Sequence, residues 1–378
     1  MLYKSTRCYL LLFIILIIVG CTSNAQTDNI ETLYFPENIS KNSINIYNQI
    51  DSLISAKAKR VGFNGNVLVN INNEAVYKKS IGFAEFRPKK KLKSESIFQL
   101  ASISKQFTAM AVMILKEKKL LSYDDDVSKY IKEFPYEGIT IRMLLNHTSG
   151  MPNYMFLTEN NWTSEKIPYN NDVVNLIIKH KPHLYFNSGT KFNYSNTGYV
   201  LLAYIVEKVS GKLFSDFMDK NIFKPLKMTN SFIYSRSYEK DYKDRVKGYF
   251  KWHGKNSLNL ETINDGIVGD KGVYTSGEDL YKWDKSLDSC TLVSKETLDE
   301  AFTRLTLKNG NQWHYGFGFR LKEEGNEKII YHYGRWNSFK NCFMKLPKYK
   351  STIIVLNNTN RNIKWLVDDI HDIIKQNQ

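Results

Sequence analysis

The sequence predicts an α+β fold in which both ends of the chain build one antiparallel sheet and the middle of the chain forms a mainly helical lobe. Near the N-terminus, residues 65–71 and 75–83 alternate between apolar and polar positions, and Asn72-Asn73 supplies turn residues between them, which predicts a hairpin. Residues 120–287 mix short helical patterns with polar loops. Strand patterns return near the end of the chain, at residues 315–321, 328–333, 339–346 and 352–356. Strands at both ends with helices between them favour a single sheet flanked by helices.

The helices of this plan show the apolar spacing of one buried face. Apolar residues recur at helical intervals over residues 44–54 and 363–374, which predicts a helix at each end of the domain. Two more helices are predicted over residues 103–115, which follow an extended segment, and over residues 199–209, which end at the stop signal Ser210-Gly211. The terminal helices are expected to cover a face of the sheet.

The first residues of the chain have the features of a bacterial export signal. Lys4 and Arg7 precede an unbroken apolar run over residues 9–19, which is too short to cross about 30 Å of hydrocarbon. The run ends in Ile18-Val19-Gly20-Cys21, which resembles a lipobox, where the cysteine is lipidated and becomes the mature N-terminus. A simple N-terminal membrane anchor is the alternative.

Lipidation of Cys21 predicts an exported, membrane-anchored bacterial lipoprotein that works on the periplasmic or cell-surface side. No later apolar run in the sequence is long enough to cross a membrane. The predicted organisation is a lipoprotein signal peptide over residues 1–20, a polar tether over residues 21–40 and one domain over residues 41–378, with its helical lobe at about residues 120–287.

Composition and charge narrow the classes of partner. The content of 42% hydrophobic and 13% aromatic residues indicates a globular protein. The formal net charge of +15 would point to nucleic acid in the cytosol, but for an exported protein anionic lipid or cell-wall polymer is the better partner. Cys290 and Cys342 have no spacing that argues for a disulfide. His180 and His183 lack a nearby third ligand, so no metal site is predicted.

A serine nucleophile needs a base that takes its proton, and one arrangement places a lysine three residues later on the same helical turn. The pattern Ser-x-x-Lys occurs at Ser102/Lys105, Ser188/Lys191 and Ser237/Lys240. Ser188 lies in a turn and Ser237 in a charged loop, whereas Ser102 stands where an extended segment enters an apolar helix. We therefore predict Ser102 as the nucleophile and Lys105 as its partner. A plain helix N-cap is the alternative for Ser102.

A second motif precedes the helix predicted over residues 199–209. The motif is Tyr194-Ser195-Asn196, and its position directly before that helix is a distinctive feature. Together with Ser102-Ile103-Ser104-Lys105 it resembles the serine beta-lactamase and penicillin-binding protein superfamily, in the branch of ampC-type beta-lactamases, D-alanyl carboxypeptidases and related esterases, where the middle motif is Y-x-N. The resemblance covers about residues 60–357 and implies a beta-lactamase/transpeptidase-like fold. Further family-like segments follow in the expected order, at residues 144–150, 225–228, 269–276 and 315–319.

The resemblance also implies roles for the residues of these motifs. Lys105 and Tyr194 would handle the proton, and which of them is the base stays open because the two titrate together. Asn196 would bind the substrate amide or orient Lys105. His147 is expected to organise a loop.

The third motif departs from the commonest family pattern. Where many relatives have K-T-G, this chain has His332-Tyr333-Gly334 on a predicted strand. His332 and Gly334 are expected to bind substrate. Because histidine is cationic only near or below its pKa of about 6.5, His332 would attract a substrate carboxylate only when protonated.

These motifs imply a serine hydrolase that forms an acyl-enzyme at Ser102 and releases it with water. Backbone N–H groups of Ser102 and of the strand after His332 would hold the oxyanion, and no cofactor or metal is required. Candidate substrates are D-alanyl peptides, including those of peptidoglycan, beta-lactams and simple esters, which the motifs do not rank. A catalytically idle penicillin-binding sensor or cell-wall scaffold is the alternative function. A basic polyanion-binding module rests on charge alone, and the export signal argues against nucleic acid as a partner.

Overall fold

The computed structural model of the chain describes residues 41–377, except residues 73, 239–241, 243 and 244. The signal peptide predicted over residues 1–20, Cys21 and the tether predicted over residues 21–40 lie outside the described residues. Within the described part of the chain, no helix is both long enough and apolar enough to span a membrane.

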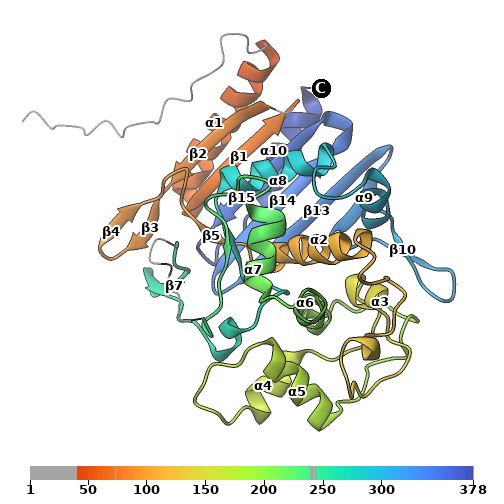
Figure 1. Ribbon diagram of the computed structural model, residues 1–378. Helices are drawn as coiled ribbons and strands as arrows, with labels where there is room; N and C mark the ends of the chain where they lie inside the picture. Colours follow the sequence, from red (N-terminus) through yellow and green to blue (C-terminus); the bar gives the residue numbers. More distant parts are fainter. Residues whose placement is uncertain (1–40, 73, 239–241, 243–244, 378) are drawn as a thin grey trace, which may run out of the picture. The chain divides into compact units, whose positions relative to one another are not determined.

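A six-stranded antiparallel sheet joins the two ends of the described chain (Figure 1). Its strands are β1 (Gly65–Ile71), β2 (Glu74–Ile81), β12 (Arg320–Glu324), β13 (Glu327–Trp336), β14 (Phe339–Leu346) and β15 (Ser351–Asn357). The strand order β12-β13-β14-β15-β1-β2 pairs the first hairpin with the last strand, so that Gly65 lies opposite Asn357. The predicted α+β fold, with one sheet built from both chain ends, is confirmed.

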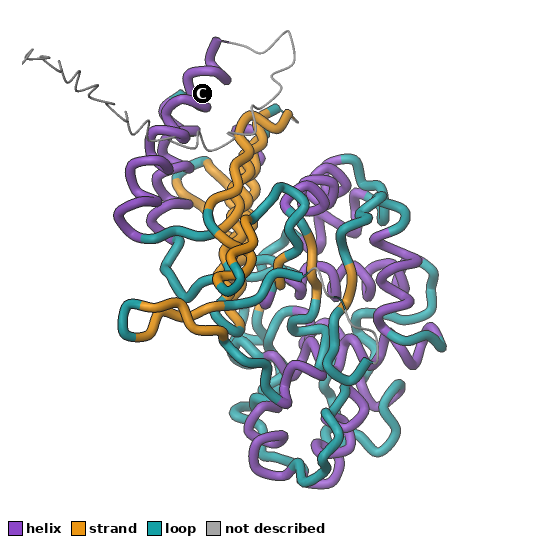
Figure 2. The backbone as a smooth tube through the Cα atoms, turned by 90° about the vertical axis from the view of Figure 1, so that its left-hand side faces the viewer, coloured by secondary structure: helices purple, strands orange, loops and turns teal. Residues whose placement is uncertain are grey.

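Alternate side chains of β1 enter two different cores, as the two-residue period of a strand requires. Val67 and Val69 pack in the core beneath the terminal helices α1 (Lys41–Val61) and α10 (Lys364–Gln376), which cover one face of the sheet (Figure 2). Leu68 belongs to the other core, which continues into the helical lobe. The sheet is therefore covered on both faces.

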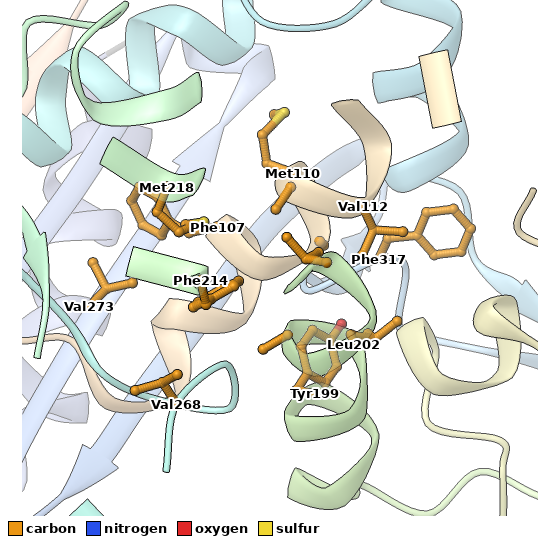
Figure 3. Packing of buried hydrophobic residues seen from close by; sticks show 14 of the residues in the cluster. Phe107, Met110, Val112, Tyr199, Leu202, Phe214, Met218, Val268, Val273 and Phe317 are labelled. Carbon is orange, nitrogen blue, oxygen red and sulfur yellow. The ribbon is translucent and has the colours of Figure 1, made fainter. Parts of the chain in front are cut away.

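The helical lobe packs around α2 (Ser104–Glu117), whose side chains are buried from Ser104 through Leu115. The helix α6 (Asn196–Ser210) lies against α2, and Figure 3 shows Phe107 and Val112 of α2 in the same cluster as Leu202 of α6. Phe107 also stacks on Trp283 of α8 (Gly277–Asp288), with ring centres 4.2 Å apart. Burial on all sides fixes α2, and with it the residues of its first turn.

Shorter elements complete the described part of the chain. The other helices are η1 (Ala101–Ile103), η2 (Val127–Lys129), α3 (Ile141–Leu145), α4 (Tyr154–Asn161), α5 (Asn170–His180), α7 (Phe214–Met218), η3 (Asp219–Phe223), η4 (Ile263–Gly266), α9 (Lys295–Ala301) and η5 (Pro347–Tyr349). The other strands are β3 (Phe83–Phe86), β4 (Lys89–Lys91), β5 (Phe98–Gln99), β6 (Phe232–Ile233), β7 (Tyr249–Trp252), β8 (Lys255–Leu258), β9 (Val273–Thr275), β10 (Leu305–Thr306) and β11 (Gln312–Trp313).

Two predicted elements differ from the structure. The strand predicted over residues 315–321 is wrong for most of its length, because β12 begins only at Arg320. Gly318 has a φ of 78°, which suits a turn, whereas a Cβ on Gly316 would lie 2.0 Å from the Ala301 carbonyl oxygen, so Gly316 allows a close contact with another segment. The helix predicted over residues 199–209 begins earlier, at Asn196, which places the end of the Y-x-N motif on its first turn.

Candidate active site

Ser102 and Lys105 lie where η1 leads from the short strand β5 into α2. Lys105 is fully buried, and its ammonium group donates hydrogen bonds to Ser102 Oγ at 3.3 Å, Asn196 Oδ1 at 2.9 Å and the Asp270 carbonyl oxygen at 2.8 Å. Three acceptors match the three protons of an ammonium group. The structure therefore brings three of the predicted site residues, Ser102, Lys105 and Asn196, into one hydrogen-bonded cluster.

Ser102 does not serve as the cap of α2. The N-cap residue is Ile103, and no side chain makes a hydrogen bond at this cap. The Ser102 hydroxyl instead accepts the bond from Lys105. Ala101, which precedes it, has a φ of 52°, a conformation that is strained for a residue with a Cβ and that persists only where its surroundings enforce it. The plain N-cap interpretation of Ser102 is therefore wrong.

Tyr194 approaches the same ammonium group from the segment before α6. Lys105 Nζ lies 5.0 Å from the centre of the Tyr194 ring. The Tyr194 hydroxyl is buried and makes no hydrogen bond to any residue that the structure describes. With no partner among these residues, this hydroxyl is available to exchange a hydrogen bond with a substrate or with water.

His147 holds the segment that carries Tyr194. Its Nδ1 accepts a hydrogen bond from the Ser195 backbone N–H at 3.1 Å, and its ring centre lies 4.3 Å from that of Tyr194. Burial, followed by the charge of Lys105, lowers the pKa of His147 well below its usual value, so the ring is neutral. This contact agrees with the expectation that His147 organises a loop.

Gly334 lets β13 approach the turn that carries Ser102. A Cβ on Gly334 would lie 2.0 Å from the Leu100 carbonyl oxygen and 3.3 Å from the Ala101 side chain. A larger residue would push the strand away from the turn, so the position needs glycine for steric reasons. The backbone of β13 thereby lies close to the predicted nucleophile.

His332 differs from the cation that the sequence led us to expect. It is 1% exposed, its Nδ1 donates to the Tyr333 carbonyl oxygen at 2.7 Å, and its Nε2 accepts from the Tyr315 hydroxyl at 3.2 Å. Burial, then the charge of Arg320, then that of Lys105, lower the pKa of His332 well below 6.5. A neutral ring gives no charge to attract a carboxylate at neutral pH, so this part of the expectation is not supported.

Arg320 is the charged residue that the sequence reasoning missed. Its guanidinium lies 5.2 Å from the ring centre of Tyr194 and 5.9 Å from that of Tyr315. No ion pair of Arg320 is found among the described residues, and arginine keeps its charge at every physiological pH. The site therefore contains a permanent cation where the sequence analysis had placed a titratable one.

The serines of the other two Ser-x-x-Lys patterns bond to backbone carbonyl oxygens. The Ser188 hydroxyl donates to the Ser149 carbonyl oxygen at 3.0 Å. The Ser237 hydroxyl bonds the carbonyl oxygens of Pro168 and Gly266, and Lys240 lies outside the described residues. Among the residues that the structure places, no set of three His, Cys, Asp or Glu side chains could hold a metal ion, and Cys290 and Cys342 are free thiols.

Comparison with known proteins decides the family. The beta-lactamase family matches residues 50–377. The chain belongs to the beta-lactamase family. Penicillin-binding protein 4* of Bacillus subtilis (strain 168) is 36% identical over 327 residues, which cover 84% of this chain and 72% of that protein. The octameric penicillin-binding protein homologue from Pyrococcus abyssi is 28% identical with a TM-score of 0.74, over 87% of this chain and 77% of that one.

A solved structure with lower sequence identity also has this fold. D-amino acid amidase from Ochrobactrum anthropi SV3 has a TM-score of 0.74 at 20% identity, over 88% of this chain and 99% of that one, and shares the fold. The resemblance to the serine beta-lactamase and penicillin-binding superfamily is thus confirmed, as is the beta-lactamase/transpeptidase-like fold. Membership of the beta-lactamase family makes this a serine hydrolase-type protein.

Proposed function

We propose that this protein is a serine acyl hydrolase that cleaves carbonyl compounds whose leaving group carries a carboxylate, with D-alanyl peptides of peptidoglycan as the first substrate class to test. The observation that carries the proposal is the hydrogen bond from the buried Lys105 to Ser102 Oγ, beside the unpaired hydroxyl of Tyr194. The similarity to a penicillin-binding protein supports the choice of substrate class. Beta-lactams and simple esters are alternative acyl donors for the same chemistry.

In the acylation step, one member of the pair Lys105 and Tyr194 acts in its deprotonated form: Ser102 Oγ forms a bond to the substrate carbonyl carbon while its proton passes to that group. Backbone N–H groups of Ser102 and of the β13 segment after Gly334 would stabilise the oxyanion, since Gly334 brings that strand against the nucleophile turn. The bond to the leaving group then breaks, and the leaving group takes the proton from the pair. Water then attacks the acyl-enzyme carbonyl and gives a proton to the same pair, and the bond from Ser102 Oγ to the acyl group breaks as Ser102 takes the proton back. No cofactor is needed.

Asn196 ties the two motifs together. Its Oδ1 accepts from Lys105, which leaves the donor groups of its amide NH₂ for other partners, such as the acyl part of a substrate. Asn196 therefore orients the lysine, and it can also donate to a substrate amide oxygen.

A leaving group that takes its proton from Tyr194 lies on the Tyr194 side of the site. Arg320 lies over the same ring, 5.2 Å from its centre. A carboxylate on the leaving group would therefore meet a guanidinium, which binds carboxylates through two parallel hydrogen bonds. Simple esters with neutral leaving groups would gain nothing from Arg320.

Replacing Arg320 should separate these substrates. Arg320→Gln is expected to lower kcat/KM for a D-alanyl peptide by roughly 10- to 100-fold, the scale of a hydrogen bond to a charged group. A matched neutral ester should change little. Because burial keeps His332 neutral, the ratio of the two kcat/KM values should stay flat between pH 6 and 9 in the wild type. A ratio that Arg320→Gln leaves unmoved, or one that falls as pH rises through the usual histidine range, would contradict this assignment.

Intact mass measured over time after mixing with a penicillin or with a fluorophosphonate tests the proposed function. Turnover predicts a penicilloyl adduct that appears and then decays, together with release of D-alanine from a D-alanyl peptide. A penicilloyl adduct that never decays, with no product from any acyl substrate, would indicate the idle sensor instead. Absence of an adduct with either reagent would reject both functions.

We further propose that the protein is a lipoprotein of the bacterial cell envelope, anchored through Cys21. Cys21→Ala should release or misprocess the protein and so change its Triton X-114 partitioning, because the variant lacks the thiol that would carry the lipid. Cys8→Ala, in the same signal segment, is the control and should partition like the wild type. Equal partitioning of wild type and Cys21→Ala would reject the lipid anchor.

A further inference from the structure

A second buried lysine lies beside the proposed proton-handling pair. Lys271 is 3% exposed, and its Nζ donates to the Tyr154 hydroxyl at 2.6 Å and to Asp270 Oδ1 at 3.3 Å. The same Nζ lies 4.8 Å from the ring centre of Trp336 on β13. Acyl transfer as described above does not use this residue.

Asp270 connects Lys271 to Lys105. Its backbone carbonyl accepts from Lys105 Nζ at 2.8 Å, while its carboxylate accepts from Lys271 and, at 3.2 Å, from the Tyr154 hydroxyl. One residue therefore offers its backbone to the first lysine and its side chain to the second. The two lysines are joined through a single, fully bonded aspartate.

The backbone holds Asp270 in this position. Gly269 and Gly272 have φ values of 104° and 103°, which residues with a side chain rarely adopt. A Cβ on Gly269 would lie 2.4 Å from the Tyr199 carbonyl oxygen of α6. The segment is thus pressed against the helix that starts with Asn196, and the Asp270 carbonyl has little freedom to leave Lys105.

Such a charge pair is poorly explained by stability alone. The side chains of Lys271 and Asp270 are 4% and 2% exposed, and removing both charges from water costs about as much as their attraction returns. The pKa of Lys271 is lowered first by burial, and the neighbouring Lys105 lowers it further, while Asp270 and Asp265 oppose the shift.

We propose that Asp270 and Lys271 are positioning residues that hold Lys105 on the nucleophile and balance the charge around it, so that it exchanges a proton with Ser102 and Tyr194 at working pH. Asp270 supplies the carbonyl that fixes the lysine. The positive charge of Lys271 offsets the negative charge of the Asp270 carboxylate. Without Lys271, an uncompensated anion beside Lys105 would stabilise its ammonium form. This role rests on the proposed function of Ser102 and Lys105.

The pH dependence of kcat/KM for a neutral ester, p-nitrophenyl butyrate, tests the role with the full-length protein. Lys271→Met should move the acid limb to higher pH by on the order of one unit and lower kcat below that limb, with little change in KM. Lys271→Met/Asp270→Asn removes both charges and should return the limb toward its wild-type position. Tyr154→Phe removes a hydrogen bond but no charge, and should leave the limb in place.

The remaining charged and titratable groups around the two lysines are unchanged in these variants. They are Asp265, His147, Tyr194, Tyr199, Arg320 and His332. Lys271→Gln is a second variant for the case in which Lys271→Met does not fold, as judged by thermal melting. An acid limb that does not move in the folded single variant, or a double variant with a limb as displaced as that of the single one, would overturn the proposal.

Failure of this proposal is distinguishable from failure of the proposed function. If the wild type forms no fluorophosphonate adduct at Ser102, the function itself has failed. If the wild type labels and turns over normally while Lys271→Met shifts no pH limb, then the charge pair has no part in proton handling.

Discussion

Ser102→Ala is expected to abolish fluorophosphonate labelling and to lower hydrolysis of every acyl substrate by roughly 10⁴-fold or more, the scale seen when a nucleophile is removed. The variant should fold normally, because the cap of α2 does not use the Ser102 side chain. Its hydroxyl accepts a bond from Lys105 at 3.3 Å, and that ammonium keeps two other acceptors in the variant. Intact mass and kcat/KM on the same preparation measure both effects.

Ser188→Ala is the matched control for this variant. Ser188 also begins a Ser-x-x-Lys pattern, but its hydroxyl bonds the Ser149 carbonyl oxygen. Labelling and turnover should stay near the wild-type level. If Ser188→Ala were the damaging change and Ser102→Ala were silent, the choice between the two motifs would be wrong.

The spacing of apolar residues in the sequence predicted the strands and helices that have a regular buried face. The hairpin at residues 65–83 and the terminal helices α1 and α10 follow it, and the structure has them where they were expected. The strand expected over residues 315–321 failed because alternating aromatic residues and glycines imitate a strand. Gly316 is instead needed where the backbone meets Ala301, a contact between segments that no local pattern reveals.

In the site too, contacts between residues close in the sequence were predicted, and contacts made only by the folded chain were not. Ser102 and Lys105 are three residues apart at the start of an apolar helix, so their spacing and local context together predict that they meet. Arg320 reaches Tyr194 only because the sheet brings β12 beside the helical lobe, and the Asp270 carbonyl reaches Lys105 only through a folded loop. The charge of His332 depends on burial, which a single sequence does not display.

Lys105→Ala and Tyr194→Phe are each expected to lower kcat by on the order of 10²-fold or more, the usual contribution of general acid–base catalysis. Lys105→Ala removes the group that bonds Ser102, whereas Tyr194→Phe keeps the ring beside Lys105 and removes one oxygen. If both serve one proton transfer, the double variant should be about as slow as the slower single variant. Single-turnover acylation by a neutral ester measures the step directly, and multiplied effects would mean that the two act in separate steps.

Tyr199→Phe provides the matched control, because two tyrosine rings flank the same ammonium group. Lys105 Nζ lies 5.5 Å from the ring centre of Tyr199 and 5.0 Å from that of Tyr194. The Tyr199 hydroxyl is committed to the Leu145 carbonyl oxygen at 2.6 Å, whereas that of Tyr194 has no partner among the described residues. Loss of the committed hydroxyl should cost stability, on the order of 1 kcal/mol, and leave the acylation rate nearly unchanged. Equal loss of rate in both variants would show that the Tyr194 hydroxyl has no special part in the proton transfer.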